Sequence, residues 1–99
     1  MTDYTFVVPT IPEGVYSVSF TLAMPTKSIQ LFLKWLTDLG YWYCYAVMPD
    51  TGIREFKAVP SMSNWSRYRD YDMVFSCPSD TMGYADLSTS TVVITDKEG

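Results

Sequence analysis

The sequence has 99 residues, of which 47% are hydrophobic, 16% aromatic and only 18% charged. That length suits one domain spanning residues 1–99, because domains typically need roughly 50 to 250 residues to enclose a core. The formal net charge of −4, from 7 basic and 11 acidic residues, argues against general affinity for phosphate backbones and so against nucleic acid as the main partner.

Turn-forming residues recur along the chain at the spacing that is typical of short strands in a sandwich or barrel. From Gly14 to Met24, large apolar side chains alternate with mostly small, polar ones, which predicts a half-buried strand. Lys27 to Thr37 fits a period of two and a helical period equally well. We favour a strand there, because a short Pro25-Thr26 turn would complete a hairpin, and a helix stays open as the alternative.

The segment from Tyr41 to Met48 is the clearest strand. Tyr41, Tyr43 and Tyr45 occupy one face, and neither face carries a charge. We therefore expect both faces to be covered and the strand to be central in its sheet.

The second half of the chain continues as a series of short elements. A turn at Pro49 to Gly52 leads into a strand from Ile53 to Val59 with one charged, solvated face. Ser61 to Asp72 has no clean period and is expected to form an ordered loop or a single helical turn. The remaining predictions are a strand at 73–77, a loop at 78–86, a final strand at 88–95 and a frayed tail at 96–99.

Together these elements predict an all-β fold, a small antiparallel β-sandwich or a partly open β-barrel of about six or seven strands. Cys44 and Cys77 form no C-x-x-C pair, and we expect them to be reduced apolar fillers. No leader-like or membrane-spanning apolar stretch is visible, so the chain is expected to be soluble and made in the cytosol.

Catalytic and metal-binding chemistry has little support. Histidine is absent, which leaves the usual zinc sets and catalytic triads incomplete. Asp70 and Asp72 have a spacing that can suit paired carboxylates, but a solvated loop explains them better. Asp80 and Asp86 do not reproduce a calcium loop and are expected to form turns. We predict no enzymatic activity, no cofactor and no metal.

An aromatic and basic cluster in the Ser61 to Asp72 loop is the main candidate for an interface. Trp, Tyr and Arg dominate the energetics of protein interfaces, although the same residues could pack internally or, less favourably, stack on nucleic-acid bases. The predicted protein-interface residues are Trp65, Arg67, Tyr68 and Arg69, together with Tyr84.

Short motifs also follow one another along nearly the whole chain. They are the Val7 to Pro12 segment with its Ile-Pro pair, Tyr16 to Phe20, Leu31 to Trp35, Gly40 to Tyr43, and Tyr84 to Leu87 before the final strand. In this order they resemble the baseplate plug family of contractile-tailed bacteriophages. Members open with an apolar strand and an "IP" element, and close with a Tyr-x-x-Leu step into a terminal strand.

The resemblance implies a structural protein of the virion, made in the host cytoplasm and located in the tail baseplate as a plug-like component. Its expected partners are hub, tube or spike proteins of the tail, with no enzymatic role. It also favours the strand interpretation of Lys27 to Thr37. The alternative is a small acidic phage-encoded inhibitor that binds a host protein by electrostatic steering, although the acidic residues form no dense run.

Overall fold

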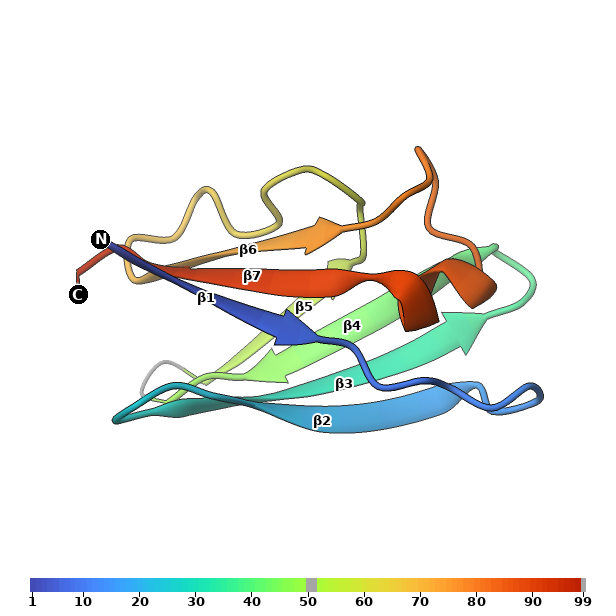
Figure 1. Cartoon of the computed structure of the whole chain (residues 1–99), viewed down its shortest axis with the longest axis horizontal. Helices are drawn as coiled ribbons and strands as arrows, with labels where there is room; N and C mark the ends of the chain where they lie inside the picture. The colour runs from blue at the N-terminus through green and yellow to red at the C-terminus, as the bar shows by residue number, and fades with distance from the viewer. Residues whose placement is uncertain (50–51, 99) are drawn as a thin grey trace.

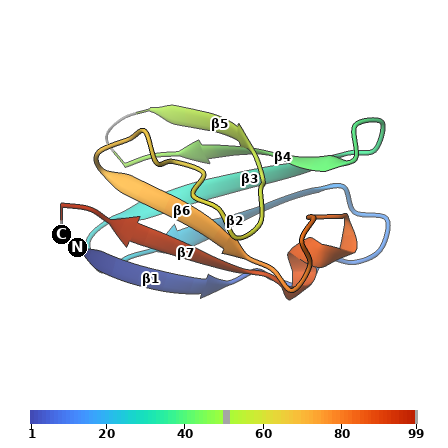
Figure 2. The ribbon, with the colours of Figure 1, turned by 90° about the horizontal axis from the view of Figure 1, so that it is seen from above.

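The computed structural model describes residues 1–49 and 52–98, which form two antiparallel sheets packed face to face (Figure 1 and Figure 2). One sheet has three strands in the order β1-β7-β6, and the other has four in the order β2-β3-β4-β5. The all-β prediction is confirmed, and the arrangement is a sandwich. The elements are β1 (Thr2–Val7), β2 (Ser17–Ala23), β3 (Ser28–Leu36), β4 (Tyr41–Val47), β5 (Ile53–Lys57), β6 (Tyr71–Ser76), the short 3-10 helix η1 (Ala85–Thr89) and β7 (Thr91–Asp96).

The β2–β3 hairpin settles the ambiguous segment in favour of a strand. Its two-residue turn is closed by a hydrogen bond of 2.9 Å from the Met24 backbone N–H to the Lys27 carbonyl. The antiparallel register places Val18 opposite Leu33, so apolar side chains of both strands point to the same side of the sheet. That side faces the three-stranded sheet and forms one wall of the core.

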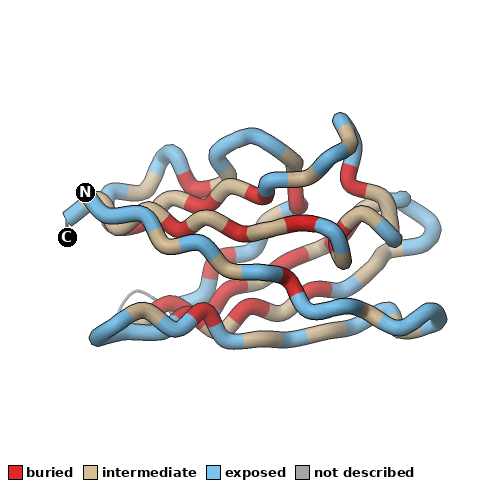
Figure 3. Tube along the Cα trace, in the orientation of Figure 1, coloured by how far each residue is buried: buried red, intermediate tan, exposed pale blue. Residues whose placement is uncertain are grey.

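Strand β4 pairs with β3 on one side and β5 on the other, which confirms its predicted central position. Its Trp42, Cys44 and Ala46 side chains are fully buried. The expectation that both faces are covered is wrong for the isolated chain, because Tyr43 and its neighbours on the opposite face stay partly exposed. The three-stranded sheet covers only the inner face, and buried residues therefore alternate with less buried ones along the strand (Figure 3).

Alternation between inward and outward side chains builds the core from both sheets. Alternate residues of β3, β4, β6 and β7 are buried, apart from Trp35 and Asp96 near the strand ends, whereas the intervening residues are partly or fully exposed. The fully buried side chains with the largest volumes are Trp42, Trp65, Phe75, Leu22, Ile29, Leu31, Met73, Leu87, Ile94, Val8, Val92 and Cys44.

Several boundaries in the second half of the chain differ from the prediction. The segment before β6 is an ordered loop, which is one of its two predicted forms, and isolated bridges from Pro60 to Phe75 and from Ser63 to Val74 hold it against β6. Strand β6 begins at Tyr71, two residues earlier than expected. The final strand begins three residues later than expected, because Ser88 lies in η1.

The ends of the chain and the β4–β5 turn also add detail. Residues 96–98 of the expected frayed tail are anchored, since the Lys97 N–H donates to the Asp70 carbonyl over 2.8 Å, whereas residue 99 lies outside the described residues. Positions 50 and 51 of the predicted turn lie outside the described residues, but Gly52 adopts a φ of 85° that favours glycine. In the described part of the chain, no helix has the length and apolarity needed to cross a membrane.

Candidate protein-interaction surface

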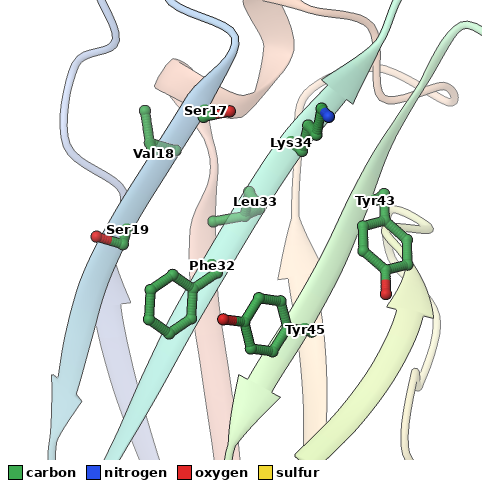
Figure 4. Close-up of a pocket in the computed structure, with 8 residues that line it drawn as sticks. All are labelled: Ser17, Val18, Ser19, Phe32, Leu33, Lys34, Tyr43 and Tyr45. Carbon is green, nitrogen blue, oxygen red and sulfur yellow. The ribbon is translucent and has the colours of Figure 1, made fainter.

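The outward side of the four-stranded sheet carries an aromatic surface that no other part of the described chain covers. We call it the outer face: the side chains of β2 to β5 that point away from the three-stranded sheet. At its centre Phe32 of β3 and Tyr45 of β4 are directly opposed cross-strand neighbours. Their rings stack with centroids 4.6 Å apart and an interplanar angle of 7° (Figure 4). Such a pair stabilises the sheet and also presents a preformed aromatic ridge.

The next row of the outer face combines tyrosine with lysine. Tyr43 lies between Lys34 and Lys57 in the cross-strand register. The Lys57 ammonium sits 4.9 Å from the centroid of the Tyr41 ring, a cation–π contact. Partial removal from water raises the pKa of the Tyr43 phenol, and a hydrogen bond to Glu55 adds to this effect. The phenol is therefore neutral at physiological pH and able to donate.

Two exposed aliphatic side chains extend this surface beyond the tyrosines. Val47 and Ile53 are direct neighbours in the β4–β5 register and are 39% and 60% exposed. Single exposed apolar residues are ordinary on a protein surface. Here they continue a row of aromatic residues on one face of the sheet, and an apolar surface of this kind is typical of interaction sites.

A shallow groove runs beside the aromatic ridge. It has a volume of about 340 Å³. Its lining includes Ser17 and Ser19 on β2, Phe32 and Lys34 on β3, and Tyr43 and Tyr45 on β4 (Figure 4). The groove exists because β2 places small side chains on the outer face next to the large ring of Phe32. A protruding side chain of a partner would find an apolar wall on one side and hydroxyl groups on the other.

The charge of the outer face differs from that of the whole chain. Its charged side chains are Lys34, Lys57 and Glu55, which leaves a local excess of positive charge, whereas the chain as a whole carries −4. Charges opposite in sign to these lysines would favour docking and orient a partner. The surface therefore fits a partner with acidic groups around an apolar centre.

The structure places the residues predicted for an interface mostly inside or along the edge of the sandwich. Trp65 is only 1% exposed and packs edge-on against Phe56 with ring centroids 5.6 Å apart. In this conformation it is a core residue and offers no surface to a partner. Internal packing, the alternative weighed on the sequence, is what the structure shows for this side chain.

Arg54 explains why the loop folds inward, and the sequence pattern gave no sign of its role. The guanidinium is 5% exposed, lies 3.8 Å from the centroid of the Tyr68 ring and 5.0 Å from that of Trp65. Its Nη2 donates to both carboxylate oxygens of Asp70 over 2.5 and 2.6 Å. Alternation places Arg54 on the same side of β5 as Phe56, and only its long-range partners show how a charge is accommodated there.

The expectation of a solvated loop is therefore wrong for Asp70. Desolvation alone would raise the pKa of its carboxyl group, but hydrogen bonds from Arg54 and from the Tyr71 backbone N–H outweigh that effect and lower the pKa. Asp72 is used locally as well, since it accepts hydrogen bonds from the Ser63 hydroxyl and from the Trp65 N–H. These carboxylates hold the loop in place.

The other predicted interface residues are divided between surface and interior. Arg67 and Arg69 are exposed, and the Arg67 guanidinium lies over the outer side of Tyr68 at 5.0 Å. Tyr84 is half-buried, stacks on Trp42 with centroids 5.6 Å apart, and donates to the Val15 carbonyl over 2.6 Å. Tyr84 thus ties the η1 region to the turn before β2.

The described residues show no arrangement suited to metal binding. They contain no group of three or more histidine, cysteine or acidic side chains that could hold an ion. Asp86 accepts from the Gly83 N–H over 2.8 Å, which fits the predicted role in a turn. Both cysteines are free thiols, and burial raises the pKa of Cys44. Comparisons with known protein families, curated proteins and solved structures return no match for this chain.

Proposed function

We propose that this chain is a structural protein of a contractile phage tail that packs in the baseplate or hub as a plug-like component. The proposal rests on the family-like order of motifs and on one structural observation, the uncovered aromatic outer face of the four-stranded sheet. A small domain with this much flat apolar and aromatic surface gains most when a neighbouring protein covers it.

The chemistry of the outer face supports protein as the partner. Tyrosine joins a large apolar ring to a hydroxyl group that needs a hydrogen-bond partner once it is buried, and such residues are enriched where two proteins meet. The stacked Phe32 and Tyr45 rings would form the centre of the contact. Lys34 and Lys57 would meet carboxylates of the partner at its rim.

The buried position of Trp65 weakens the competing role in nucleic-acid binding. A single-strand platform needs aromatic faces that bases can reach, with cations beside them. Trp65 is 1% exposed and offers no free ring face, and the Tyr68 ring is already engaged by the guanidinium groups of Arg54 and Arg67. The phage inhibitor alternative predicts instead that the chain is missing from assembled particles.

The first test is the location of the protein. Particles purified through a density gradient should contain the chain at constant stoichiometry when analysed by quantitative mass spectrometry. Its absence from intact virions, with abundant free chain in the lysate, would overturn the proposal in favour of an inhibitor.

The second test asks whether the outer face does the docking. We expect Val47→Lys to reduce incorporation into particles at least tenfold, because a new charge at an apolar contact must be desolvated. Val7→Lys is the matched control, since Val7 is 79% exposed on the other sheet. Equal incorporation of both variants would show that the outer face is not the docking surface.

A further inference from the structure

Strand β2 is an edge strand whose free side is open for pairing. The Met24 N–H donates to the Lys27 carbonyl, and the Trp35 N–H donates to the Tyr16 carbonyl. In this register the even-numbered residues from Tyr16 to Met24 form the hydrogen bonds to β3. Hydrogen-bonded and non-bonded pairs alternate along an antiparallel ladder. The N–H and C=O groups of Ser17, Ser19, Thr21 and Ala23 therefore point away from β3, toward the edge of the sheet.

This edge lacks the features that normally prevent strands from pairing with other molecules. Native proteins protect edges with charged residues, proline or bulges. The β2 sequence, SVSFTLA, contains no charge and no proline, and its register with β3 is unbroken over seven residue pairs. The other edge of the same sheet, β5, carries Arg54, Glu55 and Lys57.

The core is also incomplete along β2. Val18 and Phe20 point inward but are only partly buried, whereas Leu31 and Leu33 on the next strand are 0% and 2% exposed. A groove of about 280 Å³ separates Val18 to Phe20 from the segment 8–11 on the inner side. The groove beside Phe32 lies on the outer side of β2, next to Ser17 and Ser19.

We propose that the strand added at this edge is β2 of a second copy of the chain, paired antiparallel about a two-fold axis at Phe20. Pairing all four outward residues selects this register: Ser19 lies opposite Thr21 of the second copy, and Ser17 opposite Ala23 of the second copy. The two four-stranded sheets then become one continuous sheet, and the two outer faces form one surface. This inference goes beyond the proposed function and does not depend on it.

Several properties of β2 favour a second copy over an unrelated strand. In this register every outward N–H and C=O group of the strand gains a partner, and each copy satisfies the other in the same way. On the inner face Leu22 is already fully buried within its own copy, so the apolar contact across the joint comes from the partly buried Phe20 rings, which meet at the axis. The pairing strands carry no charge, so the net charge of −4 on each copy does not oppose contact at the joint itself.

The oligomeric state of the purified full-length chain tests the edge. Sedimentation velocity should give a dimer for the wild type and a monomer for Ser19→Pro, which removes one outward N–H and leaves the hydrogen bonds to β3 intact. Thr5→Pro is the matched control, because Thr5 lies on the β1 edge and its N–H points away from β7. The Thr5→Pro variant should therefore remain dimeric. A monomeric wild type, or a dimeric Ser19→Pro, would overturn the proposal.

Cysteine cross-linking tests the register without disturbing the core. Ser17, Ser19 and Thr21 are exposed on the outer face, so cysteine at these positions changes little inside the sandwich. Under mild oxidation, Ser19→Cys/Thr21→Cys should form a covalent dimer, because these positions face each other across the axis at a distance that suits a disulfide. Ser17→Cys/Thr21→Cys should not. Equal cross-linking of both variants would contradict the proposed register.

Discussion

The buried ion pair between Arg54 and Asp70 allows the sharpest prediction about stability. We expect Asp70→Asn to lower the free energy of unfolding by about 3 kcal/mol at neutral pH, since breaking a buried pair typically costs about 3 to 5 kcal/mol. The lower end applies because the Asp70 side chain is 23% exposed, whereas that of Arg54 is 4% exposed. For a domain of this size, such a loss lowers the melting temperature by about 15 °C.

The two partners should respond unequally. Asp70→Asn leaves a guanidinium buried without its counter-charge, and its Nη1 already has no acceptor among the described residues. Arg54→Met leaves a carboxylate that is closer to water and still accepts from the Tyr71 N–H over 2.6 Å. We therefore expect Arg54→Met to be the milder change. Replacing both partners with apolar residues should recover much of the loss.

Urea unfolding followed by tryptophan fluorescence measures these differences, with Asp80→Asn as an exposed control for the same change of charge.

The pH dependence of stability provides a second check. The pKa of Asp70 is lowered in the folded state, so its contribution is present at neutral pH and is lost as the pH falls through that lowered pKa. The gap between wild type and Asp70→Asn should close below about pH 4. A gap under about 1 kcal/mol at pH 7, or one independent of pH, would refute the reasoning.

Three further changes test other parts of the fold. Tyr84→Phe should destabilise the chain by about 1 to 2 kcal/mol, because the single hydroxyl proton is donated to the Val15 carbonyl at 2.6 Å, with the Pro12 carbonyl also within reach at 3.0 Å. A loss below about 0.3 kcal/mol in urea unfolding would contradict this role. Trp65→Ala should lower the free energy of unfolding by about 3 to 5 kcal/mol, and Arg67→Ala by less than about 0.5 kcal/mol. Similar losses for the two variants would mean that Trp65 is not a core residue. In a thiol-labelling assay, Cys77 should react in the native state and Cys44 only after unfolding, because Cys44 is buried and burial raises the pKa of its thiol. Rapid labelling of both cysteines in the native state would contradict the buried position of Cys44.

Alternation of side chains was enough to predict most of the sandwich. The β2 segment alternates large apolar with small polar residues, and the structure turns the apolar side inward. Periodicity could not decide β3, because both of its faces carry large apolar residues, including Phe32 on the outer face. The short Pro25-Thr26 turn, which makes β2 and β3 a hairpin, favoured the strand. Strand β1 was not apparent from alternation and entered only through the motif resemblance.

The surface was harder to predict than the fold, for a physical reason. Tryptophan and tyrosine alternate along β4, so both faces look suitable for a core, and only the position of the second sheet shows which face is covered. The loop residues around Trp65 looked like an interface because their partner, Arg54, is distant in sequence and occupies an inward position of β5. Long-range pairing of this kind is invisible in a local pattern.

The central claim is that another protein covers the outer face in the assembled particle. Hydroxyl-radical footprinting of the free chain and of intact particles measures this directly, with Met62, which is 62% exposed in the loop beside β6, as the internal reference. Oxidation of Phe32 and Tyr45 should fall at least fivefold in particles while that of Met62 changes little. Unchanged oxidation of Phe32 and Tyr45 in particles that contain the chain would contradict this claim.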